Sequence, residues 1–170
     1  MKNIAVFASG SGSNFQAIHT HTLNGNIAGE IVLVVSNNPN CGAINFAREK
    51  QIETLIINES RIQNPDTRED TLLQALFKFK VDLICLAGYM KILPQQIVRQ
   101  YERQILNIHP ALLPEFSGKG FYGMKVHTAV IQAGKKQSGA TIHFVDEEYD
   151  HGPVIAQQKV DIFPYDTAES

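Results

Sequence analysis

Residues 4–14 read Ile-Ala-Val-Phe-Ala-Ser-Gly-Ser-Gly-Ser-Asn, and this stretch decides the fold class. The apolar run Ile4–Ala8 is typical of a strand that is buried on both faces. The segment that follows, Ser13–Leu23, predicts a helix with Phe15 and Ile18 on one face. A buried strand, a glycine-rich turn and a helix together indicate the first unit of a parallel α/β sheet.

The same alternation of apolar runs and helical periods continues along the chain. Further strands are predicted over residues 31–36, 54–57, 82–87 and 105–109, and helices over residues 41–50, from 64–66 onward with Asp66 as cap, and over 94–101. Later, a helix over 126–134 precedes strands over 139–145 and 154–162, whose short connection predicts an antiparallel hairpin. The expected fold class is therefore α/β: a doubly wound, mostly parallel sheet with an antiparallel C-terminal edge.

The composition is that of one globular domain spanning residues 1–170. Hydrophobic residues make up 44% and charged residues 19%, which suits an ordinary core. The net charge of −2 favours neither a nucleic acid nor a membrane as partner. No apolar run approaches the roughly 20 residues of a membrane span, and the run Ile4–Phe7 is too short for a signal-peptide core, so a cytoplasmic location is expected.

The cysteines and histidines predict neither a metal site nor a disulfide. Cys41 and Cys85 lack metal-ligand spacing and are expected to be reduced structural thiols. The six histidines are scattered, with no pair four residues apart and no cysteine partner.

The loop Ser9–Asn14 suits an anion. Its glycines let backbone amides approach a ligand, and the N-terminus of the following helix adds partial positive charge. The motif is neither Walker A nor G-x-G-x-x-G, because Gly-Lys-Ser/Thr is missing and Phe15 stands where the last glycine would be. A flexible turn with Ser13 as helix cap is an equally good reading of the loop alone. Its place at the carboxyl end of the first strand favours ligand binding.

Asn107 and His109 lie at the carboxyl end of another predicted strand. Residues two apart in a strand point the same way, so both side chains can face one substrate atom. A histidine can transfer a proton near neutral pH, and an asparagine amide can donate to a developing oxyanion. Spacing alone equally allows a buried structural pair.

A carboxylate in the acidic connection between the last two strands could orient His109 and hold its charged form. By spacing, four residues qualify, namely Asp146, Glu147, Glu148 and Asp150. A solvated acidic loop is the alternative. His143 could face the site or be a hydrogen-bonded sheet residue.

Four segments together carry a family resemblance. Asn107-x-His109-Pro-Ala-Leu-Leu-Pro114 resembles the signature of the folate-dependent formyltransferases, and residues 139–155 resemble the second motif of that family. The Ser9–Asn14 loop narrows the resemblance to the member that formylates 5′-phosphoribosylglycinamide in de novo purine synthesis. Ala87–Leu93 is similar to the strand and loop of its folate pocket. The resemblance extends from residue 1 to about residue 165.

This resemblance implies a formyltransferase-like, Rossmann-related fold and a definite reaction. A formyl group would pass from the co-substrate 10-formyltetrahydrofolate to the glycinamide amine, by direct attack through a tetrahedral intermediate and without a metal. The partners would be these small molecules, with no nucleic acid or membrane, and the chain would be a monomer or homodimer.

The resemblance also implies a role for each matching residue. Asn107 and His109 would stabilise the oxygen of the intermediate, and His109 would donate a proton. Asp150 would pair with His109 and keep it protonated. The substrate phosphate would be held by Gly12, Ser13 and Asn14. The folate site would be lined by Arg68, Met90, Lys91, Ile92, Leu93 and Asn107.

Two departures and three rivals accompany the resemblance. Asp166–Ser170 has the pattern of a helix start, so the single domain is expected to lack its C-terminal helix, which in the family carries an acidic residue near the glycinamide amine. His151 stands where the family often has Gly or Glu. Methionyl-tRNA formyltransferase would need a further basic domain, and formyltetrahydrofolate hydrolase usually has an extra N-terminal one. Intact Asn107, His109 and Asp150 argue against an inactive phosphate-binding module.

Overall fold

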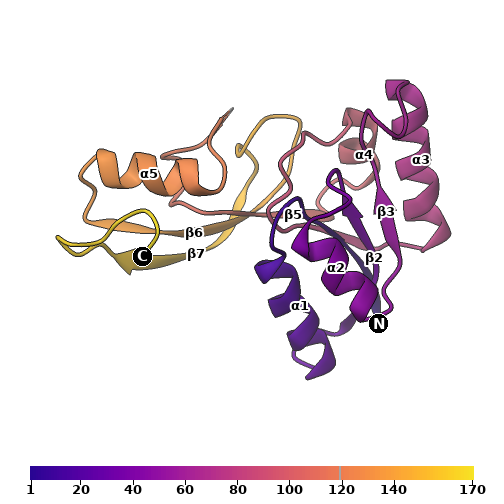
Figure 1. The fold of residues 1–170 in the computed structure, drawn as a ribbon, viewed down its shortest axis with the longest axis horizontal. Coiled ribbons are helices and arrows are strands. Elements are labelled where there is room, and N and C mark those ends of the chain that lie inside the picture. The colour runs from indigo at the N-terminus through magenta and orange to yellow at the C-terminus, as the bar shows by residue number, and fades with distance from the viewer. Residues whose placement is uncertain (119) are drawn as a thin grey trace. The chain divides into compact units, whose positions relative to one another are not determined.

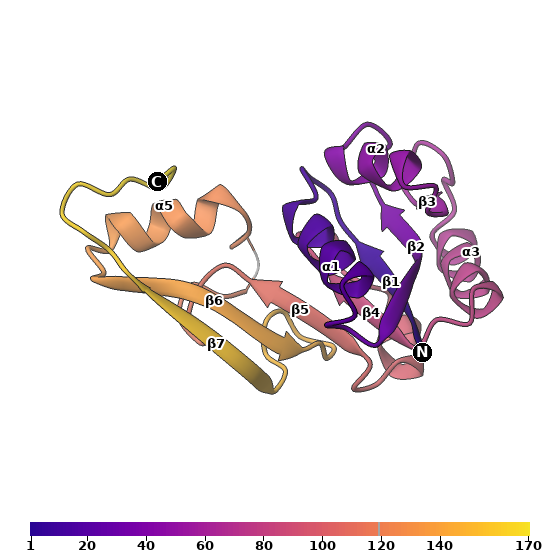
Figure 2. The ribbon, with the colours of Figure 1, turned by 90° about the horizontal axis from the view of Figure 1, so that it is seen from below.

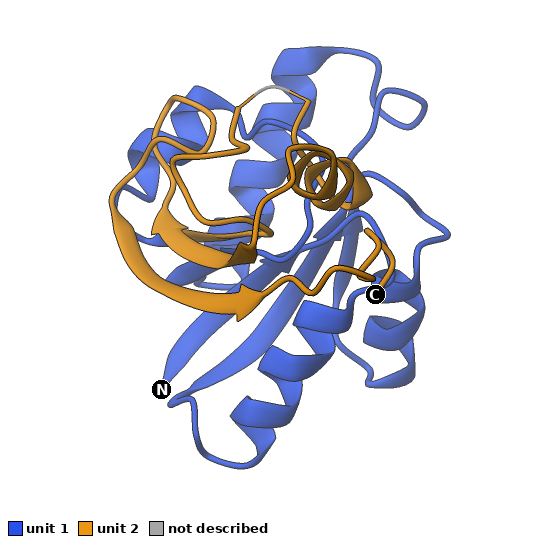
Figure 3. Cartoon of the chain, turned by 90° about the vertical axis from the view of Figure 1, so that its left-hand side faces the viewer, with its two compact units in different colours: residues 1–105 blue, residues 106–170 orange. Residues whose placement is uncertain are grey.

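The computed structural model describes residues 1–118 and 120–170. The chain divides into two compact units, residues 1–105 and residues 106–170, drawn in blue and orange in Figure 3.

The first unit contains a parallel sheet with strand order β3-β2-β1-β4 (Figures 1 and 2). Its strands are β1 (Lys2–Phe7), β2 (Gly29–Ser36), β3 (Thr54–Ile56) and β4 (Leu83–Leu86). Its helices are α1 (Ser13–Leu23), α2 (Gly42–Glu49), α3 (Pro65–Lys78) and α4 (Gln95–Gln100). Every element predicted from the sequence for this part of the chain is present, with ends that differ by a residue or two.

Strand β1 is buried on both faces because its side chains alternate between two packed layers. Ile4 and Val6 belong to a core cluster with Phe15 of α1 and Ile44 of α2. Phe7 points the other way, and its ring meets that of Tyr89 edge to face at a centroid distance of 5.3 Å. The unbroken apolar run in the sequence therefore reflects burial on both sides.

The N-cap of helix α3 lies two residues earlier than predicted. The cap is Asn64, whose Oδ1 accepts a hydrogen bond from Thr67 N at 3.0 Å, and Pro65 occupies the first turn. Asp66, the predicted cap, lies inside the helix. Proline suits the first helical position because its missing N–H would have no partner there, so the Asn-Pro pair sets the start.

The second unit contains the antiparallel strands β5 (Ile105–His109), β6 (Gln137–Phe144) and β7 (Val154–Asp161), in the order β5-β6-β7, and helix α5 (Met124–Gln132). Val126 and Val130 of α5 pack on Ala111 beside the partly buried Phe116 and Ile162. The predicted α/β fold, mostly parallel with an antiparallel C-terminal edge, is confirmed.

The chain end differs from its sequence pattern. Asp166 begins a stretch with the sequence pattern of a helix start, and residues 166–170 form no helix. Asp166 Oδ2 accepts from the backbone N of Phe163 at 2.8 Å, and so closes a turn instead. Among the described residues, no helix is long and apolar enough to cross a membrane.

Candidate functional site

The site in the second unit is built on strand β5. Asn107 and His109 alternate with Ile108 and share one face of the strand. In the antiparallel pairing of β5 with β6, Asn107 lies opposite His143 and His109 lies opposite Thr141. Two histidines and an amide therefore meet in a small area, and both imidazoles are almost fully buried, with 3% of His109 and 1% of His143 exposed.

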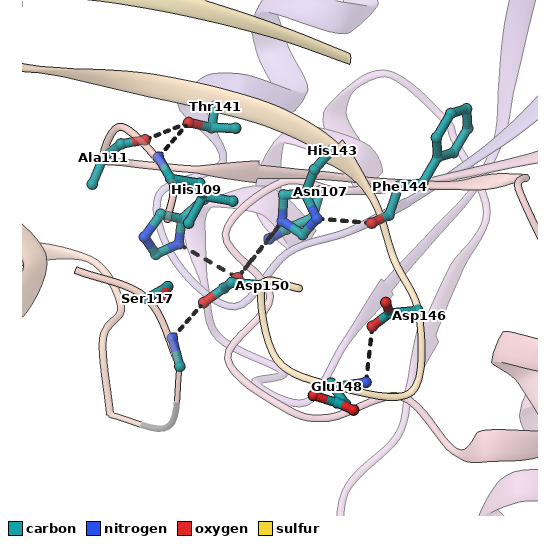
Figure 4. A network of polar contacts seen from close by, with 12 residues as sticks. Asn107, His109, Ala111, Ser117, Thr141, His143, Phe144, Asp146, Glu148 and Asp150 are labelled. Atoms are coloured by element: carbon teal, nitrogen blue, oxygen red, sulfur yellow. Dashed lines mark hydrogen bonds and ion pairs between the residues drawn. The ribbon is translucent and has the colours of Figure 1, made fainter. Parts of the chain in front are cut away.

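Asp150 reaches this cluster from the connection between β6 and β7 (Figure 4). Its Oδ1 lies 3.5 Å from His109 Nδ1, 3.4 Å from Asn107 Nδ2 and 3.6 Å from His143 Nε2. Its Oδ2 accepts a hydrogen bond of 3.0 Å from the backbone N of Gly118. One carboxylate therefore lies close to nitrogen atoms from three segments of the unit.

The surroundings of Asp150 determine its charge. Burial by itself raises the pKa of this carboxyl, but hydrogen bonds from His109 and the Gly118 backbone, together with the charge of His109, outweigh burial and hold the pKa well below its ordinary range. Asp150 is consequently an anion at neutral pH. Its fixed negative charge lies where a positive charge on His109 would be stabilised.

The other acidic side chains of this loop have different environments. Asp146 accepts from His151 Nδ1 at 2.9 Å and from the backbone N of Glu148 at 2.9 Å. Hydrogen bonding to Asp146, followed by the charges of Glu148 and Asp146, raises the pKa of the exposed His151. Asp146 thus closes the loop on itself, whereas Asp150 faces the histidines.

The sequence left open whether His143 faces the site, and the structure places it there. Its Nδ1 lies 2.8 Å from the Phe144 carbonyl oxygen, which only accepts, so Nδ1 carries a hydrogen. Its Nε2 lies 3.0 Å from Asn107 Nδ2. The same amide nitrogen faces the Asp150 carboxylate, where an amide oxygen would be repelled, so Asn107 donates and His143 Nε2 accepts. His143 therefore fixes which end of the Asn107 amide faces the cluster.

His109 is held between two acceptors. Its Nδ1 faces Asp150, and its Nε2 lies 2.8 Å from the carbonyl oxygen of Phe116. Phe116 has a positive φ of 53°, a conformation uncommon outside glycine, and this turn aims its carbonyl at the ring. A doubly protonated imidazole satisfies both contacts, because each protonated nitrogen then donates.

Thr141 supports the turn after His109, a role that no sequence pattern indicated. It is fully buried, its Oγ1 donates to the Ala111 carbonyl at 2.6 Å, and it accepts from Leu113 N at 3.0 Å. Gln157 Nε2 adds a bond of 2.9 Å to the same oxygen. A cavity of about 270 Å³ opens next to this turn, and its lining includes Pro114 and Asp150.

The glycine-serine loop belongs to the first unit. Gly12, not Ser13, is the N-cap of α1, with φ +81°, and no side chain caps the helix. A Cβ at Gly12 would lie 2.8 Å from Ala43 Cα, so the close approach of α2 requires glycine there. Ser13 and Asn14 are exposed in the first turn. The first N–H groups of a helix have no partner within the helix, so the N-terminus of α1 is suited to an anion.

Apart from Asn107, the expected folate residues lie in the first unit. Met90 and Ile92 are 51% and 59% exposed, Lys91 is exposed, and Leu93 is buried. Arg68 lies in α3, where its Nη1 donates to the carbonyls of Ile62 and Gln63 at 2.7 and 2.9 Å. These bonds use one nitrogen of the guanidinium, which carries five N–H donors. The structure thus gives Arg68 a visible local role beside the expected one.

The cysteines have the surroundings expected of structural thiols. Cys41 is buried, and burial raises the pKa of Cys85 to about 11. The Cys85 thiol is therefore not poised as a nucleophile, because the reactive species is the thiolate. Within residues 1–118 and 120–170, no group of His, Cys, Asp or Glu could hold a metal ion.

Comparison with known proteins places this chain in a family. The formyl transferase family model matches residues 2–170. The chloroplastic phosphoribosylglycinamide formyltransferase of Vigna unguiculata is 46% identical over 99% of the chain, which spans 54% of that protein. The phosphoribosylglycinamide formyltransferase of Bacillus subtilis is 38% identical, with 100% of this chain and 85% of that protein covered. The crystal structure of glycinamide ribonucleotide transformylase 1 from Geobacillus kaustophilus is similar with a TM-score of 0.91 and 37% identity, covering 99% of this chain and 87% of that one. The chain belongs to the formyl transferase family.

Proposed function

We propose that this chain transfers a formyl group from 10-formyltetrahydrofolate to the amine of 5′-phosphoribosylglycinamide, a step of de novo purine synthesis. The observation that carries the proposal is the cluster around Asp150. Its Oδ1 lies 3.4 Å from Asn107 Nδ2 and 3.5 Å from His109 Nδ1. The Vigna and Bacillus relatives are named phosphoribosylglycinamide formyltransferase, and their similarity to this chain covers 99% and 100% of it. A single formyltransferase domain over residues 1–170 is part of the proposal.

The reaction needs a charge to be stabilised and a proton to be moved. The amine attacks the formyl carbon, a C–N bond forms, and the carbonyl electrons move onto oxygen. When the intermediate collapses, the bond from the formyl carbon to N10 of the folate breaks, N10 takes a proton, and the attacking nitrogen loses one. One hydrogen-bond donor, one cationic acid and one carboxylate meet these needs.

The contacts support a proposal of which atoms would fill these roles. Asn107 Nδ2 directs one N–H to His143 at 3.0 Å and the other to Asp150 at 3.4 Å. The longer bond is the weaker one, so its N–H is the one that an oxyanion would accept from. His109 would donate from Nε2 once the Phe116 carbonyl gives way to substrate, and Asp150 would hold its charge at Nδ1.

Substrate binding is assigned to exposed segments of the first unit. Gly12, Ser13 and Asn14 would bind the phosphate through the α1 N-terminus. Folate would contact the segment Met90–Leu93, together with Arg68 and Asn107. The proposal requires no metal and leaves the choice between monomer and homodimer open. The cytoplasmic location stays a prediction, because the Vigna relative is a chloroplast protein.

The decisive experiment mixes the protein with 5′-phosphoribosylglycinamide and 10-formyltetrahydrofolate and follows both tetrahydrofolate and the formylated product. Equal appearance of the two products is the expected result. Tetrahydrofolate released without formylated product would mean hydrolysis and would contradict the transferase assignment. Because the chain spans only part of some relatives, the assay is repeated with any longer form of the protein, and no turnover with either form would refute the proposal.

A further inference from the structure

Ser9 lies just after β1 and is 7% exposed. Its hydroxyl accepts a hydrogen bond from Met90 N at 2.9 Å and contacts Asn37 Oδ1 at 2.5 Å. The backbone N–H of Met90 can only donate, so the single hydroxyl hydrogen goes to Asn37. Ser9 N donates in turn to the Gly88 carbonyl at 3.1 Å. One buried residue therefore joins the loops that follow β1, β2 and β4.

The two segments that meet at Ser9 are anchored differently. Toward its far end the glycine-serine loop is held by α2, because Ala43 N donates to the Gly10 carbonyl at 3.1 Å and a Cβ on Gly42 would lie 2.6 Å from Ser11 O. The segment after β4 turns at Gly88 with φ +79°, and the Met90 side chain is half exposed. Because burial of the Met90 side chain does little to hold this residue in position, the hydrogen bond from Met90 N to Ser9 is the more important restraint.

We propose that Ser9 is a positioning residue that holds the glycine-serine loop and the Met90–Leu93 segment in one arrangement. The inference rests on the proposed function, which assigns the loop to the substrate phosphate and the segment to folate. Ser9 acts through the backbone of Met90 and through its own place at the start of the loop. Its effect should therefore fall on the binding of both substrates and spare the chemistry at His109.

The test is Ser9→Ala in the full chain. A lost buried hydrogen bond is worth about 0.5–1.5 kcal/mol, so KM for both substrates should rise about three- to tenfold while kcat stays within about twofold. Ser9→Cys, with a weaker donor of similar size, should give intermediate KM values, and it replaces Ser9→Ala if that variant does not fold. Unchanged KM values, or a fall in kcat alone, would overturn the proposal.

Ser36→Ala is the matched control. Ser36 is also a fully buried serine at the end of a strand, and its hydroxyl accepts from Asn38 N at 3.0 Å and lies 3.4 Å from Cys41 Sγ. None of these partners belongs to the Met90–Leu93 segment. Removal of the Ser36 hydroxyl should lower the melting temperature and leave both KM values unchanged. If Ser36→Ala raised the KM values as much as Ser9→Ala, the effect of Ser9→Ala would be general destabilisation and the proposal would be overturned.

A second measurement separates this proposal from the proposed function. Hydrogen exchange at the Met90 amide should be about three- to tenfold faster in Ser9→Ala than in the unmodified protein, whether or not the protein turns over substrate. Unchanged exchange would refute the positioning role. Faster exchange in a protein that does not transfer formyl groups would support the positioning role of Ser9. It would also reject the assignment of the two segments to these substrates.

Discussion

Replacing Asp150 by asparagine separates the charge of the site from its shape. At 3.5 Å, the distance from Oδ1 to His109 Nδ1, the interaction of two unit charges is about 5 kcal/mol at an effective dielectric constant of about 20. The amide retains an oxygen for Gly118 N, and waters and neighbouring dipoles offset part of the loss. About 3–4 kcal/mol of transition-state stabilisation should therefore disappear, which is a fall in kcat of about 10²- to 10³-fold.

Folding should be affected much less than catalysis by this substitution. The contact of 3.0 Å from Gly118 N survives with a neutral acceptor, so the free energy of unfolding should fall by no more than about 1–2 kcal/mol. Initial rates of tetrahydrofolate formation and thermal melting measure the two effects. Asp146→Asn is the control, because that carboxylate lies in the same loop but binds His151, and its kcat should stay within about threefold. Activity of Asp150→Asn within about threefold of the unmodified protein would refute the electrostatic role of Asp150.

Three further predictions concern His109, Gly12 and the contribution of Asp150 to stability in acid. His109→Ala should abolish measurable turnover and still bind 5′-phosphoribosylglycinamide in calorimetry; lost binding would instead make His109 a ligand or folding residue. Gly12→Ala should cost about 1–3 kcal/mol in chemical denaturation and weaken phosphate-substrate binding, because the residue has φ +81° and its Cβ would meet Ala43; unchanged affinity would argue against the loop as the phosphate site. The folded pKa of Asp150 lies below its unfolded value, so the carboxylate adds stability above the unfolded pKa of about 4, and this is lost as pH falls further. Acid titration should accordingly show a smaller loss of stability below about pH 4 in Asp150→Asn than in the unmodified protein.

The sequence predicted elements well where the signal is local. Strand β5 has the bounds expected from its apolar pattern, and helix α1 likewise begins and ends as expected. The predicted cap of α3 was wrong because two side chains with capping oxygens, Asn64 and Asp66, flank Pro65. Only the preference of proline for the first helical position identifies Asn64 as the cap. Such a distinction depends on backbone geometry that composition does not contain.

The parts of the site that the sequence left open depend on contacts between distant residues. His143 faces Asn107 because β5 and β6 pair in one register, and a shift of one residue would turn it to the other face. Phe116 contacts His109 only because the turn after β5 folds back. Ser9 meets Met90 across 81 positions of the chain. Alternation shows which residues share a face, but the pairing register and loop closure decide which of them touch.

The selection of Asp150 among four acidic residues follows from the shape of its loop. Phe144 N donates to the Pro153 carbonyl at 2.9 Å and closes the base of the hairpin. A side chain at Gly152 would collide with the Phe144 carbonyl, so the chain can pass there only as glycine. Asp150 then has a φ of +51°, a left-handed conformation that Asp adopts more readily than most residues and that turns its carboxylate toward His109. A glutamate at the same position would reach farther and fit this conformation less well, so both chemistry and backbone geometry favour aspartate.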